Sequence, residues 1–204
     1  SVVGNFKFYE SSNKRLKLFS QLNLKRVNIR NAFLAFDNFK QDFITAEHIK
    51  GVGAAEIEMQ ATWKSGFIFE EEELKVKSHL IIEKGELIQF KPLESLSSFV
   101  SLDDLKYVKF STLENTIEID NNVITIPTME IKSSALSVFL SGTHTFEQEI
   151  DYSIKLLLSE LLSNTFRKKN TTINNEFGEV NEDGGNFTTV YLKMTGNTDD
   201  PKIS

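Results

Sequence analysis

The stretch NTIEIDNNVITI, residues 115–126, decides the fold class. Its apolar residues stand at every second position, so Ile117 and Ile119 share one side of an extended strand. Asn121 and Asn122 follow, and asparagine tolerates the left-handed backbone that a two-residue hairpin turn requires. The alternation then resumes. The stretch therefore predicts a β-hairpin with one apolar and one polar face.

The same alternation recurs in both directions from this hairpin, and we interpret the chain as roughly ten strands. One polar and one apolar side is typical of an antiparallel sheet that is solvated on one face. We expect Lys84 and Gly85 to separate two of the strands. The further predicted strands cover residues 55–61, 74–77, 79–82, 86–90, 135–141, 150–156 and, as the final strand, 188–195.

Two segments have helical rather than alternating spacing. Residues 92–100 place Leu93, Leu96 and Val100 on one side, and a proline suits the first turn. Residues 159–169 end in three basic side chains, which favour a helix C-terminus. We expect two short amphipathic helices here and a polar loop over 170–186, whereas residues 10–26 match no pattern.

So little helix excludes the crossovers of a parallel α/β sheet. The prediction is a mainly β fold, in which one twisted antiparallel sheet curls into an open groove or half-barrel. An apolar face that never closes needs the helices, a partner or an apolar ligand to cover it.

Composition narrows the function classes. The chain has 204 residues and no cysteine, which excludes a disulfide framework, a thiolate metal site and a cysteine nucleophile. Its formal charge of -6 offers no general attraction to nucleic acid. No apolar run approaches the ~20 residues that span a bilayer, and no signal peptide is visible. Because the chain starts without methionine, we expect a targeting or anchoring segment upstream.

No arrangement of residues predicts a reaction. The glycines of GVG, residues 51–53, lack the third glycine and the helix of a dinucleotide site, so we expect a turn or bulge. His48, His79 and His144 are dispersed without metal-ligand spacing, and we expect each on the surface or on an edge strand. The acidic run of residues 70–73 is interpreted as a solvated turn rather than a cation site. We therefore predict no catalytic residue, no metal and no cofactor.

Several segments resemble, in order and spacing, the C-terminal region of AsmA-like proteins of Gram-negative bacteria. The resemblance covers residues 43–204. The segments that carry it are AEHIKGVG (46–53), IEKGELIQFKPL (82–93), LKYVKFSTL (105–113), IPTMEIKS (126–133), SGTHTF (141–146), IDY (150–152) and LKMTGNTDDPK (192–202).

This resemblance implies a C-terminal domain over 41–204, preceded by a loosely similar strand repeat over 1–40. The family lies in the periplasm, tethered to the inner membrane by a segment absent from this chain. It is related to TamB-like and bridge-type lipid-transfer proteins, whose apolar β-grooves are thought to shield acyl chains. Phospholipid transport, outer-membrane assembly and membrane-protein partners are implied for the family, and catalysis is not.

On this reading, apolar strand residues would line a lipid groove, and Leu93, Leu96 and Val100 would plug it. The expected lining residues are Ile57, Met59, Val76, Ile117, Ile119, Ile126, Leu136, Val138, Leu140, Tyr152, Ile154, Leu156 and Leu192.

Two other functions stay open on the residues alone. In a structural or protein-interaction domain, the same apolar residues would form an ordinary packed core, and an edge strand would dock the partner. A carbohydrate-active enzyme would need paired carboxylates in a cleft, whereas the acids here fall mainly in turns and on polar strand faces.

Overall fold

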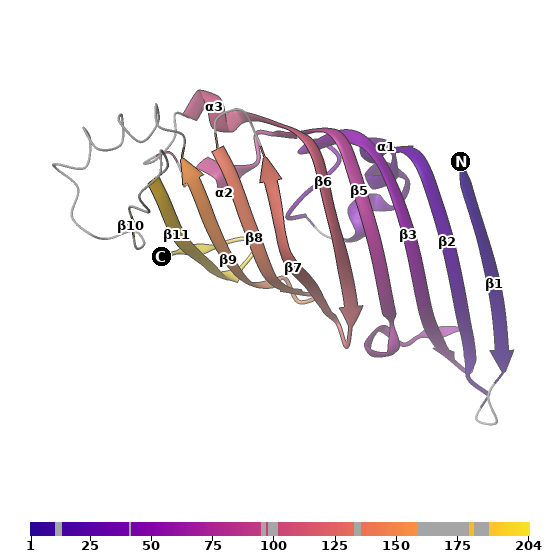
Figure 1. The fold of residues 1–204 in the computed structure, drawn as a ribbon. Coiled ribbons are helices and arrows are strands. Elements are labelled where there is room, and N and C mark those ends of the chain that lie inside the picture. Colours follow the sequence, from indigo (N-terminus) through magenta and orange to yellow (C-terminus); the bar gives the residue numbers. More distant parts are fainter. Residues whose placement is uncertain are drawn as a thin grey trace.

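The computed structural model describes residues 1–10, 14–40, 42–94, 97, 102–132, 136–158, 180–181 and 188–204. Its strands form one antiparallel sheet that does not close on itself, which confirms the mainly β, curled and open fold predicted from sequence (Figure 1). The second predicted helix, residues 159–169, lies outside the described residues, as does the predicted loop over 170–186 apart from residues 180 and 181.

Each long strand pairs with the next long strand along the chain, so the sheet is a meander ordered β1-β2-β3-β5-β6-β7-β8-β9-β11-β10. Short β4 joins β3, and short β12 joins β11. The long strands are β1 (Val2–Glu10), β2 (Leu16–Asn28), β3 (Ile49–Lys64), β5 (Lys75–Ile88), β6 (Tyr107–Asp120), β7 (Val123–Lys132), β8 (Leu136–Thr145), β9 (Glu149–Leu158) and β11 (Thr188–Asn197). The short ones are β4 (Ile68–Phe69), β10 (Val180–Asn181) and β12 (Lys202–Ile203).

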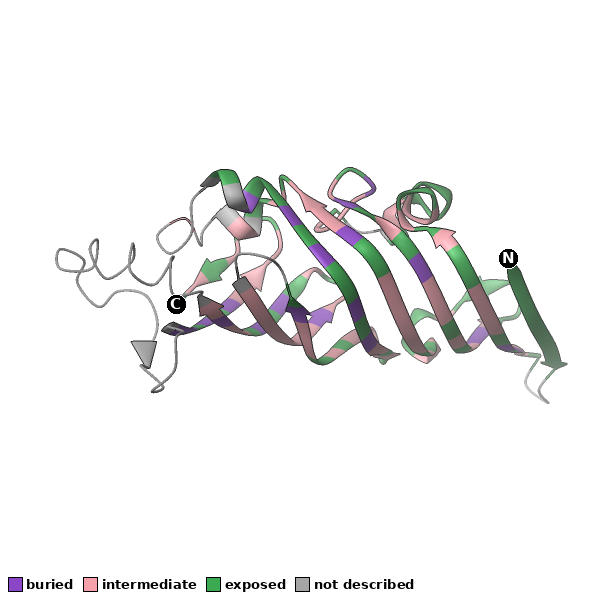
Figure 2. Cartoon of the chain, turned by 45° about the horizontal axis from the view of Figure 1, so that its top comes forward, coloured by how far each residue is buried: buried purple, intermediate pink, exposed green. Residues whose placement is uncertain are grey.

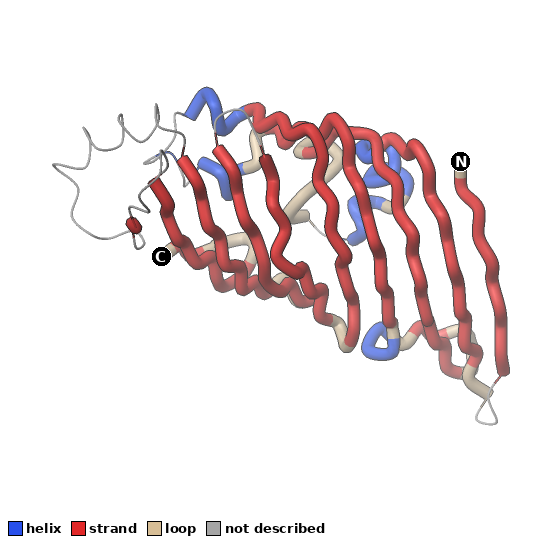
Figure 3. Tube along the Cα trace, viewed as in Figure 1, coloured by secondary structure: helices blue, strands red, loops and turns tan. Residues whose placement is uncertain are grey.

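Helices are few and short (Figure 3). They are α1 (Ile29–Ala35), η1 (Asp37–Lys40), η2 (Glu71–Glu73), α2 (Lys91–Glu94) and α3 (Leu102–Lys106). The helix predicted over 92–100 starts near its expected position, but α2 ends at Glu94. Most residues from there to α3, including Leu96 and Val100, lie outside the described part of the chain.

The hairpin that decided the fold class is present as predicted. Asn121 and Asn122 both adopt left-handed backbone angles, with φ of 50° and 60°, and connect β6 to β7. Two positive φ angles in succession are those of a type I′ turn, whose twist matches that of the flanking strands. Ile119 and Ile124 consequently face each other across the hairpin.

Lys84 and Gly85 do not separate two strands, so this part of the prediction was wrong. Both lie inside continuous β5, and Lys84 has a left-handed φ of 51°. Before Lys84 the side chains on the apolar face stand at even positions, such as Ile82. After it they stand at odd positions, such as Leu87. A Cβ on Gly85 would lie 2.0 Å from the ring of Phe110 on β6, so the glycine makes room for that ring.

The stretch 10–26, which matched no pattern, contains most of β2. Its leucines do alternate, since Leu16, Leu18, Leu22 and Leu24 lie on one side, but Ser20 on that side and Phe19 on the opposite side weaken the contrast between the two faces. The predicted final strand is β11, yet β12 follows it and pairs with it. The bulge expected at the glycines of 51–53 is present, because the β3–β5 register shifts between Lys50 and Val52.

The hydrophobic core lies on the apolar face of the sheet in three clusters. One joins Leu156, Val190 and Leu192 to Leu105 of α3. The second centres on Phe110, Leu113 and Ile131, and the third on Ile150, Tyr152 and Met194. All three belong to the half of the sheet from β6 to β11, where most of the buried strand positions lie (Figure 2).

Candidate functional site

The register of the ladders brings the apolar strand residues onto one face of the sheet. Because antiparallel partners point to the same side, a row can be followed from strand to strand. One row crosses most of the sheet through Phe6, Ser20, Met59, Val76, Ile119, Ile124, His144 and Ile150.

The thirteen residues expected to line a groove all have ladder positions on this face. Ile57 and Ile117 belong to the row beside the one just described, on either side of Ser78. Leu136 lies opposite Leu158 in the β8–β9 ladder. The others beyond β6 fall into three rows of the second half, namely Ile126 with Tyr152, Leu140 with Ile154 and Leu192, and Val138 with Leu156.

Burial divides this face into two regions. We call the half from β7 to β11 the covered floor, defined by Ile150, Tyr152, Leu156, Val190, Leu192 and Met194, which are all buried. The side chain of Leu156 is 0% exposed and packs in one cluster with Leu105 and Leu93. Side chains of α2 and α3 thus already occupy the place where a ligand would contact this region.

A connecting segment, residues 43–48, also crosses the covered floor. We call this segment the plug, and it is distinct from Leu93, Leu96 and Val100, which were expected to plug the groove. The ring of Phe43 stacks on Tyr152 at a centroid distance of 6.3 Å and meets Phe90 edge-on at 5.2 Å. Tyr152 lies on β9, whereas Phe90 follows the end of β5. A single ring that touches both shows that the sheet curves toward its apolar face. Sequence analysis missed the plug because Phe43 belongs to no periodic segment.

The plug is held in place by specific hydrogen bonds. The backbone N–H of Ala46 donates to Oδ1 of Asn38 at 2.9 Å, and the carbonyl of His48 accepts from the N–H of Ile88 at 2.8 Å. Asn38 itself has a left-handed φ of 51°, as have Asp37 and Phe39 beside it. Three such residues in succession, none of them glycine, are costly unless their surroundings hold them, so the plug has one defined path.

His144 was predicted on the surface or on an edge strand, and this is wrong. It is buried on the covered floor, with Nδ1 3.3 Å from the hydroxyl oxygen of Tyr152 and its ring against Phe43. The error arises because a histidine on a strand carries no sequence signal for which face it occupies. Burial lowers the pKa of His144 below its ordinary value and raises the pKa of Tyr152 to about 12.

A pH dependence of stability follows from this burial. Below its ordinary pKa of 6.5, His144 takes up a proton in the unfolded chain more readily than in the folded one. We expect the free energy of unfolding to fall as the pH decreases from about 6.5 toward the lowered pKa. Urea denaturation at pH about 7.5 and about 5.5 measures this, and a His144→Gln variant should lose less stability between the two.

A His79→Gln variant is the matched control for this experiment. His79 lies on the polar face, where its Nε2 is 3.2 Å from a carboxylate oxygen of Glu114. Replacing His79 is expected to leave unchanged the decrease in the free energy of unfolding that His144 causes at lower pH. Equal pH profiles of the wild type and the His144→Gln variant would contradict the assignment.

The other half of the apolar face is not covered in this way, and we call it the open floor. Its residues on β1 are exposed and those on β2, β3, β5 and β6 are partly exposed, and among the described helices α1 lies against β2 and β3 at one end and η2 against β3 at the other. It comprises Val2, Phe6 and Phe8 on β1, Leu22 on β2, Ile57 and Met59 on β3, Val76 on β5, and Ile117 and Ile119 on β6. Five adjacent strands spaced by about 4.8 Å make it about 19 Å wide.

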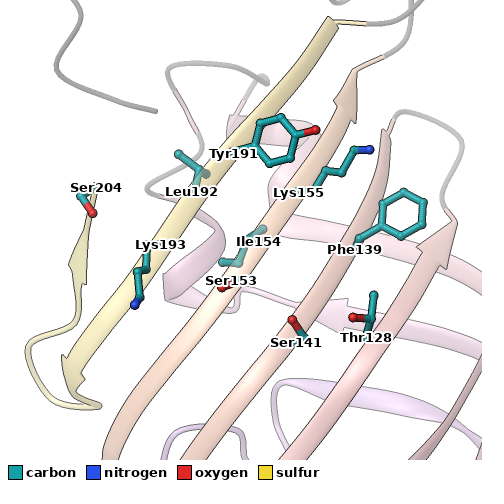
Figure 4. Close-up of a pocket in the computed structure, with 10 residues that line it drawn as sticks. All are labelled: Thr128, Phe139, Ser141, Ser153, Ile154, Lys155, Tyr191, Leu192, Lys193 and Ser204. Atoms are coloured by element: carbon teal, nitrogen blue, oxygen red, sulfur yellow. The ribbon is translucent and has the colours of Figure 1, made fainter. Parts of the chain in front are cut away.

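The opposite face of the sheet is polar and carries cross-strand ion pairs. Lys77 pairs with Glu118 and Lys75 with Asp120, both at 2.9 Å. It also has a shallow hollow over β7, β8, β9 and β11, where the Lys155 ammonium lies 5.7 Å and 5.6 Å from the ring centroids of Phe139 and Tyr191 (Figure 4). The ammonium group and the two rings attract one another through cation–π interactions, so the hollow is accounted for by its own side chains.

The acidic run between β4 and β5 is a structural connection. Arg15 donates hydrogen bonds to the carboxylates of Glu70 and Glu73. The hydrogen bond from Arg15 is the main reason why the pKa of Glu73 lies below its ordinary value. A guanidinium that already neutralises these carboxylates agrees with the interpretation as a turn rather than a cation site.

Within the described residues, no three histidine or acidic side chains gather as ligands for a metal ion. No helix in this part of the chain is long and apolar enough to cross a membrane. Comparison of the chain with protein-family models, with curated proteins and with solved structures finds no match.

Proposed function

We propose that this chain is a non-enzymatic, lipid-binding β-groove domain of the AsmA-like kind, acting in phospholipid transport and outer-membrane assembly in the periplasm. Acyl chains would lie on the open floor. The ordered resemblance described above supports the family and the compartment. The open floor supports the ligand class.

One observation carries the proposal. Aliphatic and aromatic side chains, interrupted by Ser20 and Ser78, continue across five strands, and those of the open floor keep part of their surface accessible. A soluble domain rarely leaves so large an apolar surface to water unless something binds there. An acyl chain needs such a continuous wall and no specific polar partner.

The energetics agree with this ligand. Removing a methylene from water is worth about 0.8 kcal/mol, so about ten shielded methylenes contribute about 8 kcal/mol. That gain is of the same order as the cost of association, about 4–15 kcal/mol. The expected complex is therefore reversible, as transport requires.

The burial of several expected lining residues narrows the proposed lipid site to the open floor. Of the residues expected to line the groove, Tyr152, Leu156 and Leu192 are buried under the plug and α3. In the proposal they are core residues that close one end. Ile57, Met59, Val76, Ile117 and Ile119 are the lining, joined by the apolar residues of β1 and β2.

A protein-interaction domain is the second candidate, and the edge of β1 favours it. Ser1 and Lys25 exchange two backbone hydrogen bonds of 2.7 Å and 2.9 Å, so odd residues of β1 bond to β2. The N–H and C=O groups of Val2, Phe6 and Phe8 therefore point away from the sheet, within the part of the chain described. Such an edge can accept another strand.

The single tryptophan provides a direct test. Trp63 is partly buried, and it lies at the end of β3 on the same face as Ile57 and Met59. Monomeric phospholipid with a spin label on its acyl chain should quench Trp63 fluorescence saturably, and native mass spectrometry should detect co-purified phospholipid. Absence of both would reject lipid binding and leave the interaction domain.

A further inference from the structure

The strongest unassigned feature is a group of exposed apolar side chains beyond the ends of β2 and β3. We call the segment from Lys25 to Phe39 the aromatic rim. Its α1 stands at the margin of the sheet and presents mainly exposed residues (Figure 2). Leu34 is exposed as well as Phe36 and Phe39, which are 63% and 55% accessible.

These rings form a compact cluster rather than isolated surface residues. Phe36 stacks on Phe39 at a centroid distance of 5.4 Å, and Phe33 meets Phe39 edge-on at 5.1 Å. Ile29 on the other side of α1 points at Gly53 of β3, where an added Cβ would lie 2.4 Å from it. The helix is thus fixed to the sheet through one side while the rings of Phe36 and Phe39 remain in water.

The charges around the cluster are positive, although the chain as a whole carries a net charge of -6. Lys25, Arg26 and Arg30 are exposed, and none of them forms an ion pair within the described residues. The same segment holds one carboxylate, Asp37. Free cations beside exposed aromatic rings are complementary to an anionic lipid surface, where rings enter the headgroup layer and cations approach phosphates.

We propose that the aromatic rim docks this domain onto the surface of an anionic lipid bilayer, with Leu34, Phe36 and Phe39 at headgroup depth and Lys25, Arg26 and Arg30 against phosphates. The rim adjoins the end of the open floor at β2 and β3. A docked domain would therefore hold its open floor next to the bilayer. The docking surface is separate from the open floor, so either proposal can fail alone.

Vesicle flotation with the purified chain tests the proposal. Vesicles containing phosphatidylglycerol should float the protein at low salt, and vesicles of phosphatidylcholine alone should float much less. Each basic residue near an anionic surface contributes about a fivefold factor in partitioning, so an Arg26→Glu/Arg30→Glu variant should bind at least about 25-fold more weakly. A Phe36→Ser/Phe39→Ser variant should lose binding even at low salt.

Matched controls separate the rim from general surface effects. Phe67, 80% exposed in the turn before β4, provides a Phe67→Ser variant that removes a ring elsewhere. A Lys7→Glu/Lys84→Glu variant changes net charge as much as the double arginine variant does. Both controls should float like the wild type, and all rim variants should retain quenching of Trp63 by monomeric lipid.

Three results would overturn docking at the rim. They are absence of flotation with anionic vesicles, equal flotation of the rim variants and the wild type, and equal loss in the control variants. Loss of Trp63 quenching with intact flotation would instead count against the open floor and leave the rim supported.

Discussion

Replacing Leu156 by alanine is expected to lower the free energy of unfolding by about 2–5 kcal/mol, because it opens a cavity at a fully buried site. Leu156 is 0% exposed and joins the sheet to α3 through Leu105. Equilibrium urea denaturation followed by circular dichroism measures the change. A loss of this size would establish that the covered floor is core.

The neighbouring Leu157 is the control, since it lies on β9 but points to the other face. Its side chain is only half-buried, so Leu157→Ala should cost clearly less than Leu156→Ala. Similar losses in the two variants would mean that the covered floor is not packed as described. They would also return Tyr152 and Leu192 to the candidate lipid-lining residues.

Placing two carboxylates on the apolar side of β1 is expected to weaken lipid binding at least tenfold. Val2 and Phe6 are exposed residues of the open floor, so a Val2→Asp/Phe6→Asp variant should still fold. A charged group beside an acyl chain loses its hydration without gaining a partner, which opposes binding. Titration with spin-labelled phospholipid, read by Trp63 fluorescence, measures the change.

The same strand offers a close control on its polar side. Val2 and Val3 are adjacent and exposed to 66% and 68%, yet they point to opposite faces. A Val3→Asp/Tyr9→Asp variant therefore makes the same change in charge on the same edge strand. It should bind lipid like the wild type, and equal weakening in both variants would contradict binding on the open floor.

Local pattern was sufficient where apolar and polar residues alternate without interruption. The alternation around Ile117 and Ile119 and the Asn121-Asn122 turn predicted β6, β7 and their hairpin. The same reasoning failed at Lys84, where a left-handed residue inside β5 imitates a turn in the sequence. It failed in β2 because Ser20 occupies an apolar position and Phe19 lies on the opposite face, which weakens the alternation of the leucines.

The sequence by itself determined that this protein is a one-sided antiparallel sheet, because alternation requires only the period of a strand and the contrast between water and core. The sequence could not indicate which part of the apolar face is covered and which part is open. Whether Leu156 is core and Ile57 is available depends on which distant segments cover each residue. Only the tertiary structure decides that, through the curvature of the sheet and the placement of Phe43, α2 and α3 over one half, since contacts between residues far apart in the chain leave no local pattern.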